Sequence, residues 1–247
     1  MAAVKPTFVF VPGAWHSPEG FAVVRQQLEA HGYPTEAVSH PSIGSAPPFP
    51  SLPDDAANLR ALLQELIDAR KDVVVVMHSY AGFVGQNAVQ GLPASTKAGT
   101  GGILMMVFLA ALVATKGNTV LDILGGQKLP WMLFEGRVSF ATTPEEIFYH
   151  DIPDEEQKKL VAKLQHISTS VFSSPITYEP WHDFQCCFFY CEDDRALPLE
   201  VQKAMAQLLG RSRIEFSCKA SHSPFFSMPE KVVEVLEFAV AEGEKRR

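Results

Sequence analysis

The chain has 247 residues, of which 47% are hydrophobic and 20% are charged, the balance of an ordinary globular protein. Its net charge of −7 argues against nucleic-acid binding, which needs a basic face, and no apolar run is long enough to span a membrane. The N-terminus shows no secretory signal, and the four cysteines have no zinc-like spacing to histidine. We therefore expect a cytoplasmic protein with reduced thiols, no metal and no organic cofactor.

Apolar runs alternate with helical periodicities through the first 114 residues. Strands are predicted at 7–11, 35–38, 73–77 and 103–109. Helices are predicted from Ser17 to Gly32, over 54–69 and from Gly82 onward. The order strand, helix, strand predicts an α/β fold with a mostly parallel, doubly wound sheet.

The alternation breaks over residues 115–183, which contain no valine-rich strand. This stretch holds several aromatic residues and a helix start with acids in its first turn, and we interpret it as a helical cap over the carboxyl edge of the sheet. A peripheral helical decoration is the alternative. Strands at 184–191 and 213–218 and helices at 198–209 and 229–242 then resume the core. The predicted domains are a core of 1–114 and 184–247 and an inserted cap of 115–183.

A candidate nucleophile, Ser79, lies where four valines at 73–76 give way to a helical pattern. A sharp turn from strand to helix around a serine is the context of a nucleophile elbow, and it would aim helix amides at a developing negative charge. The G-x-S-x-G pattern is imperfect, because Met77 occupies the first glycine position and Ala81 the last. On this segment alone, Ser79 could equally be a helix cap.

Loops after two later strands supply a candidate acid and base, Asp194 and His222. The carboxyl ends of parallel strands share one edge of a sheet, so both loops should lie beside Ser79. The chain order serine, acid, histidine is that of α/β-hydrolases. Asp193 and Glu192 are rival acids in the same loop, and we prefer Asp194 for its distance from the next helix.

An oxyanion hole needs two N–H donors, for which we predict the backbone amides of Tyr80 and Ala14. Ala14 lies in the loop after the first strand, where Gly13 gives the backbone room to turn. Further residues expected around the substrate are Gly13, His16, Trp131, Phe134 and Trp181. Core packing explains the aromatic residues of the cap equally well.

Taken together, these residues resemble the α/β-hydrolase superfamily, and in particular small lidded members such as plant methylesterases, hydroxynitrile lyases and their fungal and bacterial relatives. The matching segments are FVFVPGAWHSPEGF, VVVVMHSYAG, CEDDRALPLEVQ and SHSPFFSMPE. The resemblance places the catalytic serine, acid and histidine at Ser79, Asp194 and His222. Hydroxynitrile lyases of this type carry threonine and lysine where this chain has Gly13 and Ser223, so the resemblance favours an esterase.

We therefore expect a serine hydrolase that cleaves a small, fairly apolar carboxylic ester or lactone through an acyl-enzyme on Ser79. A lyase or carbon–carbon bond-cleaving enzyme with the same site is the alternative, and a non-catalytic small-molecule receptor ranks last. The expected partner is a small-molecule substrate, with no nucleic acid and no membrane. The sequence leaves the oligomeric state undecided, with a homodimer as one alternative.

Overall fold

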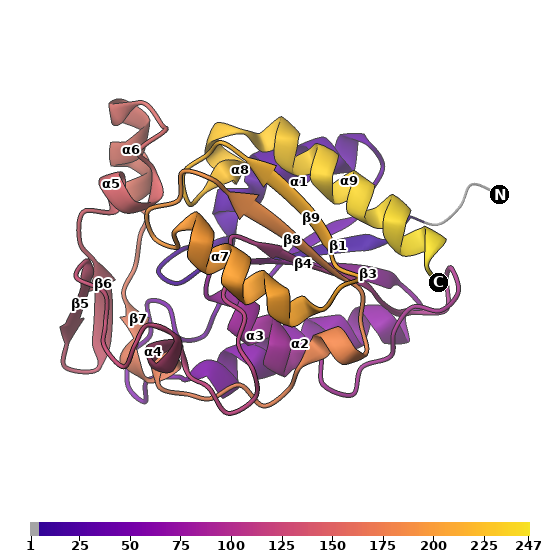
Figure 1. Cartoon of the computed structure of the whole chain (residues 1–247), viewed down its shortest axis with the longest axis horizontal. Helices are drawn as coiled ribbons and strands as arrows, with labels where there is room; N and C mark the ends of the chain where they lie inside the picture. Colours follow the sequence, from indigo (N-terminus) through magenta and orange to yellow (C-terminus); the bar gives the residue numbers. More distant parts are fainter. Residues whose placement is uncertain (1–4) are drawn as a thin grey trace.

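A six-stranded parallel sheet organises the computed structural model, which describes residues 5–247 (Figure 1). Its strand order is β2-β1-β3-β4-β8-β9, and every adjacent pair is parallel. The strands are β1 (Thr7–Val11), β2 (Thr35–Ala37), β3 (Asp72–His78), β4 (Gly102–Leu109), β8 (Cys186–Cys191) and β9 (Ile214–Cys218). The predicted doubly wound α/β sheet is confirmed.

Helices cover both faces of this sheet (Figure 1). One face packs against α1 (Ala22–Ala30) and α9 (Pro229–Lys245), and the other against α2 (Leu52–Asp68), α3 (Ala81–Ala88) and α7 (Leu199–Ala206). The alternate residues of β3 therefore enter different cores, with Val75 on one face and Val74 and Val76 on the other. Burial on both faces is the physical reason for the unbroken valine run.

Residues 115–183, which we call the insertion, lie between β4 and β8. The insertion contains α4 (Val120–Ile123), β5 (Met132–Glu135), β6 (Val138–Ala141), α5 (Pro144–Phe148), α6 (Asp154–Val161), β7 (Ile167–Ser168) and the 3-10 segments Thr169–Phe172 and Pro180–His182. Figure 1 shows α5, α6, β5, β6 and β7 of the insertion on the side toward which the arrows of β8 and β9 point. Within residues 5–247, no helix is both long enough and apolar enough to cross a membrane.

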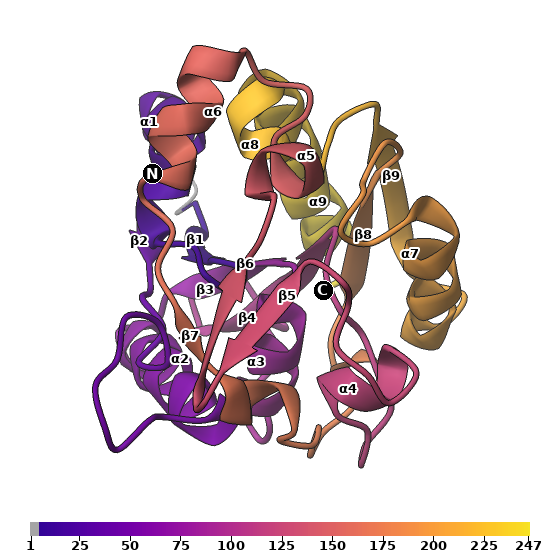
Figure 2. The same cartoon turned by 90° about the vertical axis from the view of Figure 1, so that its left-hand side faces the viewer.

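The insertion is not purely helical as expected, because besides α4, α5 and α6 it contains β5, β6 and β7, which form a second, antiparallel sheet (Figure 2). A two-residue connection, Gly136-Arg137, joins β5 to β6, and Gly136 has a φ of +60° that suits such a tight turn. Both strands are only four residues long and lack the valine-rich run that marked the core strands. The available sequence signal was the glycine of the Gly136-Arg137 connection between two short, largely apolar runs.

Met77, the departure from the G-x-S-x-G pattern, is fully buried against α3. A Cβ added to Gly85 of α3 would lie 2.1 Å from Met77 Sδ, so the missing side chain at position 85 provides the space for Met77. The close approach of strand and helix is therefore kept with methionine on the strand and glycine on the helix.

This packing predicts that Gly85→Ala destabilises the protein by about 1–3 kcal/mol through overpacking. Met77→Ala in the same chain removes the clash. The double variant should therefore lose less free energy of unfolding than the sum of the losses in the two single variants. Urea unfolding of all variants measures the coupling. Gly243→Ala is the control, because its new methyl group would approach Leu104 on the other face of the sheet. Its loss in free energy of unfolding should simply add to that of Met77→Ala.

Candidate active site

Ser79 occupies the turn between β3 and α3 with a φ of +56°, which is uncommon for a residue other than glycine. The Ser79 carbonyl accepts hydrogen bonds from the amides of Gly82 at 3.0 Å and Leu112 at 2.9 Å. A Cβ added to Gly13 would lie 3.0 Å from Ser79 Cβ, so the loop after β1 presses directly on this turn. These contacts hold the left-handed conformation at Ser79, whose side chain remains partly exposed.

Asp194 and His222 meet behind this serine. His222 Nδ1 lies 2.7 Å from Asp194 Oδ2, and both side chains are buried. The other carboxylate oxygen, Oδ1, accepts hydrogen bonds from the backbone amides of Ala196 and Leu197, each at 2.8 Å. Gln202 Nε2 lies 3.3 Å from Oδ2. A carboxylate can only accept, so Nδ1 of His222 donates and its Nε2 is left as an acceptor.

The rival acids of the same loop have other partners. Glu192 accepts a hydrogen bond from Ser217 Oγ at 2.6 Å. Asp193 bonds through its backbone, with its amide donating to the carbonyl of Ala220 at 3.2 Å. Of the three acids, Asp194 is therefore the one hydrogen-bonded to His222.

Tyr80 is tied into the core beside Ser79. Its hydroxyl donates to Asp55 Oδ2 at 2.9 Å, and burial raises the pKa of Tyr80 well above its ordinary value. Among residues 5–247, no carbonyl or side chain accepts a hydrogen bond from the backbone amides of Tyr80 or Ala14. Both amides are therefore available to a bound group.

A cavity opens over Ser79, His222, Ala14 and Tyr80. Core residues Trp15, Leu112, Ala196 and Leu197 form part of its wall. The insertion supplies the remainder, with Val120, Leu124, Leu129, Trp131, Met132 and Phe172. The described residues place no aspartate, glutamate, lysine or arginine in this lining.

Trp131 lines the cavity as predicted, but Phe134 and Trp181 do not. Phe134 stacks on the outer side of Phe172 with ring centroids 5.5 Å apart, so it lies one layer behind the wall. Trp181 is half-buried in a 3-10 segment of the insertion. The aliphatic lining from α4 and the segment after it was missed, because its sequence carries no feature that separates it from ordinary core.

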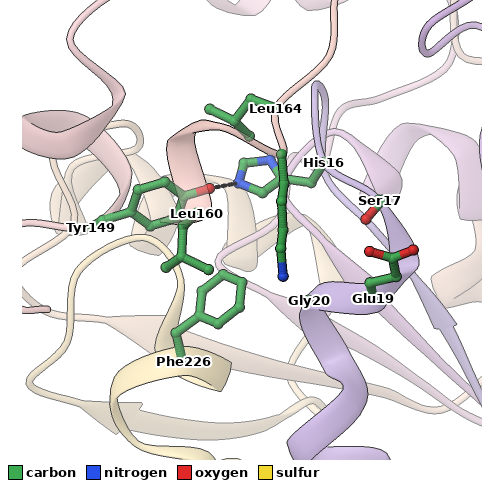
Figure 3. A pocket seen from close by; sticks show the side chains of 9 residues that line it. His16, Ser17, Glu19, Gly20, Tyr149, Leu160, Leu164 and Phe226 are labelled. Carbon is green, nitrogen blue, oxygen red and sulfur yellow. Dashed lines mark hydrogen bonds between the residues drawn. The ribbon is translucent and has the colours of Figure 1, made fainter. Parts of the chain in front are cut away.

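His16 is also absent from this cavity and faces a second one (Figure 3). Its Nε2 lies 2.7 Å from the hydroxyl of Tyr149, and its Nδ1 lies 2.7 Å from the carbonyl of Ala14. Burial, together with the nearby His222, lowers the pKa of His16 to about 4 against the opposing effect of the hydrogen bond to the Ala14 carbonyl. A neutral His16 therefore donates from Nδ1 to Ala14 and accepts from Tyr149 at Nε2.

His78, next to the serine in sequence, packs beneath the turn rather than beside the cavity. Its Nε2 donates to the backbone carbonyl of His222 at 2.9 Å. Desolvation, followed by the influence of His222 and His16, lowers the pKa of His78 well below its ordinary value. His78 is thus a neutral, buried support for the loop that carries His222.

The pKa of His16 predicts a loss of stability in acid. The unfolded chain takes up the proton near pH 6.5 and the folded chain only near 4, so stability falls as the pH falls below 6.5. At pH 5 the loss from His16 is about 2 kcal/mol relative to neutral pH. Urea unfolding at pH 7 and pH 5 should show a smaller loss for His16→Gln than for the parent. Equal losses would contradict this assignment.

The sequence matches the alpha/beta hydrolase family over residues 8–235. It is 28% identical over 246 residues to alpha/beta hydrolase nvfD of Aspergillus novofumigatus, covering 97% of this chain and 98% of that relative.

Two solved structures share the fold. A pyrethroid hydrolase from Sphingobium faniae JZ-2 superimposes with a TM-score of 0.77 at 22% identity, covering 97% of this chain and 99% of that one. Tomato methylketone synthase I, complexed with 2-tridecanone, gives a TM-score of 0.78 at 16% identity over 97% of this chain and 99% of that one. The match to the family spans nearly the whole chain, and the chain therefore belongs to the alpha/beta hydrolase family.

Proposed function

We propose that this chain is a serine hydrolase that cleaves a small, apolar carboxylic ester or lactone through an acyl-enzyme on Ser79. The observation that carries the proposal is that Ser79 and His222 line one apolar cavity, while Asp194 is hydrogen-bonded to the far side of the His222 ring. A serine hydroxyl needs such a base, and the base needs an orienting acid.

In the proposed reaction, Nε2 of His222 removes the Ser79 proton as the serine oxygen attacks the ester carbonyl. The charge that forms on the carbonyl oxygen would be stabilised by the backbone amides of Ala14 and Tyr80. His222 then returns the proton to the leaving alcohol. A water molecule, activated by the same histidine, would release the acid and restore Ser79.

The cavity supports a neutral substrate. A free carboxylate or ammonium group in the substrate would lose its hydration without an oppositely charged side chain in the lining. The aliphatic and aromatic wall from the insertion suits an acyl or alcohol group of modest size. In this proposal the insertion is the cap that sets substrate shape.

Labelling with a fluorophosphonate probe tests the nucleophile. We expect the intact protein to gain one adduct, and the modified peptide to carry it on Ser79. Ser79→Ala should abolish the adduct, and His222→Ala should slow labelling at least about a hundredfold because the serine loses its base. Ser212→Ala, an exposed serine in the turn before β9 and outside the cavity lining, is the matched control and should label like the parent.

A folded parent that resists the probe while turning over a ketone or β-hydroxy substrate would contradict the ester hydrolase proposal. That result would instead support carbon–carbon cleavage or a lyase reaction at the same site. A folded parent that shows neither labelling nor turnover but still binds apolar ligands would support a receptor.

The cavity wall predicts acyl-chain selectivity. Leu124→Ala removes wall volume, so kcat/KM for p-nitrophenyl octanoate relative to p-nitrophenyl butyrate should rise at least about fivefold. Leu121→Ala, a neighbouring leucine in α4 outside the lining, should leave the ratio unchanged. An equal change in both variants would mean that the wall does not contact the acyl chain.

A further inference from the structure

Four consecutive residues of the insertion, 148–151, reach the loops around Ser79, Asp194 and His222. We call residues 12–16 the oxyanion loop, 191–197 the acid loop and 219–223 the base loop. The 148–151 segment begins at the last residue of α5 and reads Phe-Tyr-His-Asp. Each of its residues bonds to one of these three loops.

Contacts to the base loop involve both ends of the segment. Asp151 Oδ2 accepts the backbone amide of Ser221 at 2.9 Å and the hydroxyl of Ser227 at 2.7 Å. Ser221 Oγ donates to the carbonyl of Phe148 at 2.8 Å. Since Ser221 immediately precedes His222, these bonds fix the backbone from which the imidazole projects. The Phe148 ring also packs 5.6 Å from the His222 ring.

The acid loop is bound through His150. Its Nε2 lies 2.9 Å from the carbonyl of Asp193, the residue before Asp194, and donates to it. The amide of Asp193 in turn donates to the carbonyl of Ala220 in the base loop. The segment thus contacts both loops whose side chains meet in the Asp194–His222 hydrogen bond.

The oxyanion loop is bound through Tyr149 (Figure 3). The buried Tyr149 hydroxyl donates to His16 Nε2, and His16 Nδ1 donates to the carbonyl of Ala14. That carbonyl belongs to the same peptide plane as the amide of Trp15, whose φ is +67°. A chain of two hydrogen bonds therefore runs from the insertion to a peptide plane beside the Ala14 amide.

Two further bonds connect the insertion to this loop. The Trp15 indole donates to the carbonyl of Ser139 in β6 at 3.0 Å, and the Gln165 amide donates to the carbonyl of Trp15 at 3.0 Å. The strained backbone at Trp15 is held by these contacts, since such a conformation persists only where its surroundings fix it.

We propose that the 148–151 segment positions the three loops, with Tyr149, His150 and Asp151 as positioning residues and His16 as the link to the oxyanion loop. The insertion then does more than line the cavity. A displacement of α5 would move the base loop and the oxyanion loop together, because the 148–151 segment is bonded to both. This inference rests on the proposed function for its catalytic consequence, while its structural part concerns the loops alone.

Hydrogen–deuterium exchange of the full-length protein tests the structural part without any substrate. Tyr149→Phe should speed exchange in peptides covering the oxyanion loop at least about threefold, and Asp151→Ala should do the same for the base loop. Asp151→Asn keeps an acceptor oxygen and should recover most of the parent's protection. Glu156→Gln, an exposed α6 residue without a bond to these loops, is the matched control. Parent-like exchange in both Tyr149→Phe and Asp151→Ala would overturn the proposal.

Steady-state hydrolysis of p-nitrophenyl butyrate tests the catalytic part. Tyr149→Phe should lower kcat at least about tenfold with KM changed less than about threefold, because positioning acts on the transition state rather than on substrate binding. Faster exchange with an unchanged kcat would overturn the positioning role. If the parent itself fails to hydrolyse the ester, the proposed function fails, and the exchange data still decide whether the segment holds the loops.

Discussion

The left-handed turn at Ser79 is the constraint on which the site depends. A non-glycine residue at a φ of +56° costs about 1–3 kcal/mol, so neighbouring contacts must hold it. Gly13 allows the oxyanion loop to lie against the turn, and Gly82 lets α3 approach the backbone of Leu112, where a Cβ would come within 2.0 Å of the carbonyl oxygen. The turn lifts the serine to the edge of the sheet, where it lines the same cavity as His222.

The hydrogen-bond partner distinguishes the histidines that gather around this turn. His16, His78 and His222 are all buried, and burial disfavours the charged form of an imidazole. The first two donate to backbone carbonyls, and their pKa values are lowered. His222 alone of the three is hydrogen-bonded to a carboxylate, which can stabilise the imidazolium that forms when a proton is taken up. The proposed base is thus distinguished by its partner rather than by its exposure.

Much of this arrangement could be predicted from the sequence. Buried parallel strands produce long apolar runs, and the residues after those runs must share one edge of the sheet, which placed Ser79, Asp194 and His222 together. The lining of the cavity was harder to predict from the sequence, because Phe134 and Phe172 belong to different elements and their stacking decides which one faces inward. The β5–β6 hairpin was missed because its strands are only four residues long.

The contacts of the 148–151 segment could not be derived from the sequence at all. Tyr149 and His16 are 133 positions apart, and a hydrogen bond between them follows only from how the insertion sits on the core. Similarly, Asp151 bonds to a backbone amide, which carries no residue-specific sequence signal. Long-range side-chain contacts of this kind depend on the tertiary arrangement rather than on local propensity.

The most direct test of the proposed chemistry is a crystal structure of the protein after reaction with a fluorophosphonate. We expect a covalent bond from Ser79 Oγ to phosphorus, with the phosphonyl oxygen about 2.7–3.1 Å from the amides of both Ala14 and Tyr80. The alkyl chain should lie against Trp131 and Leu124 in the apolar cavity. An adduct on another residue, or a phosphonyl oxygen directed away from those two amides, would contradict it.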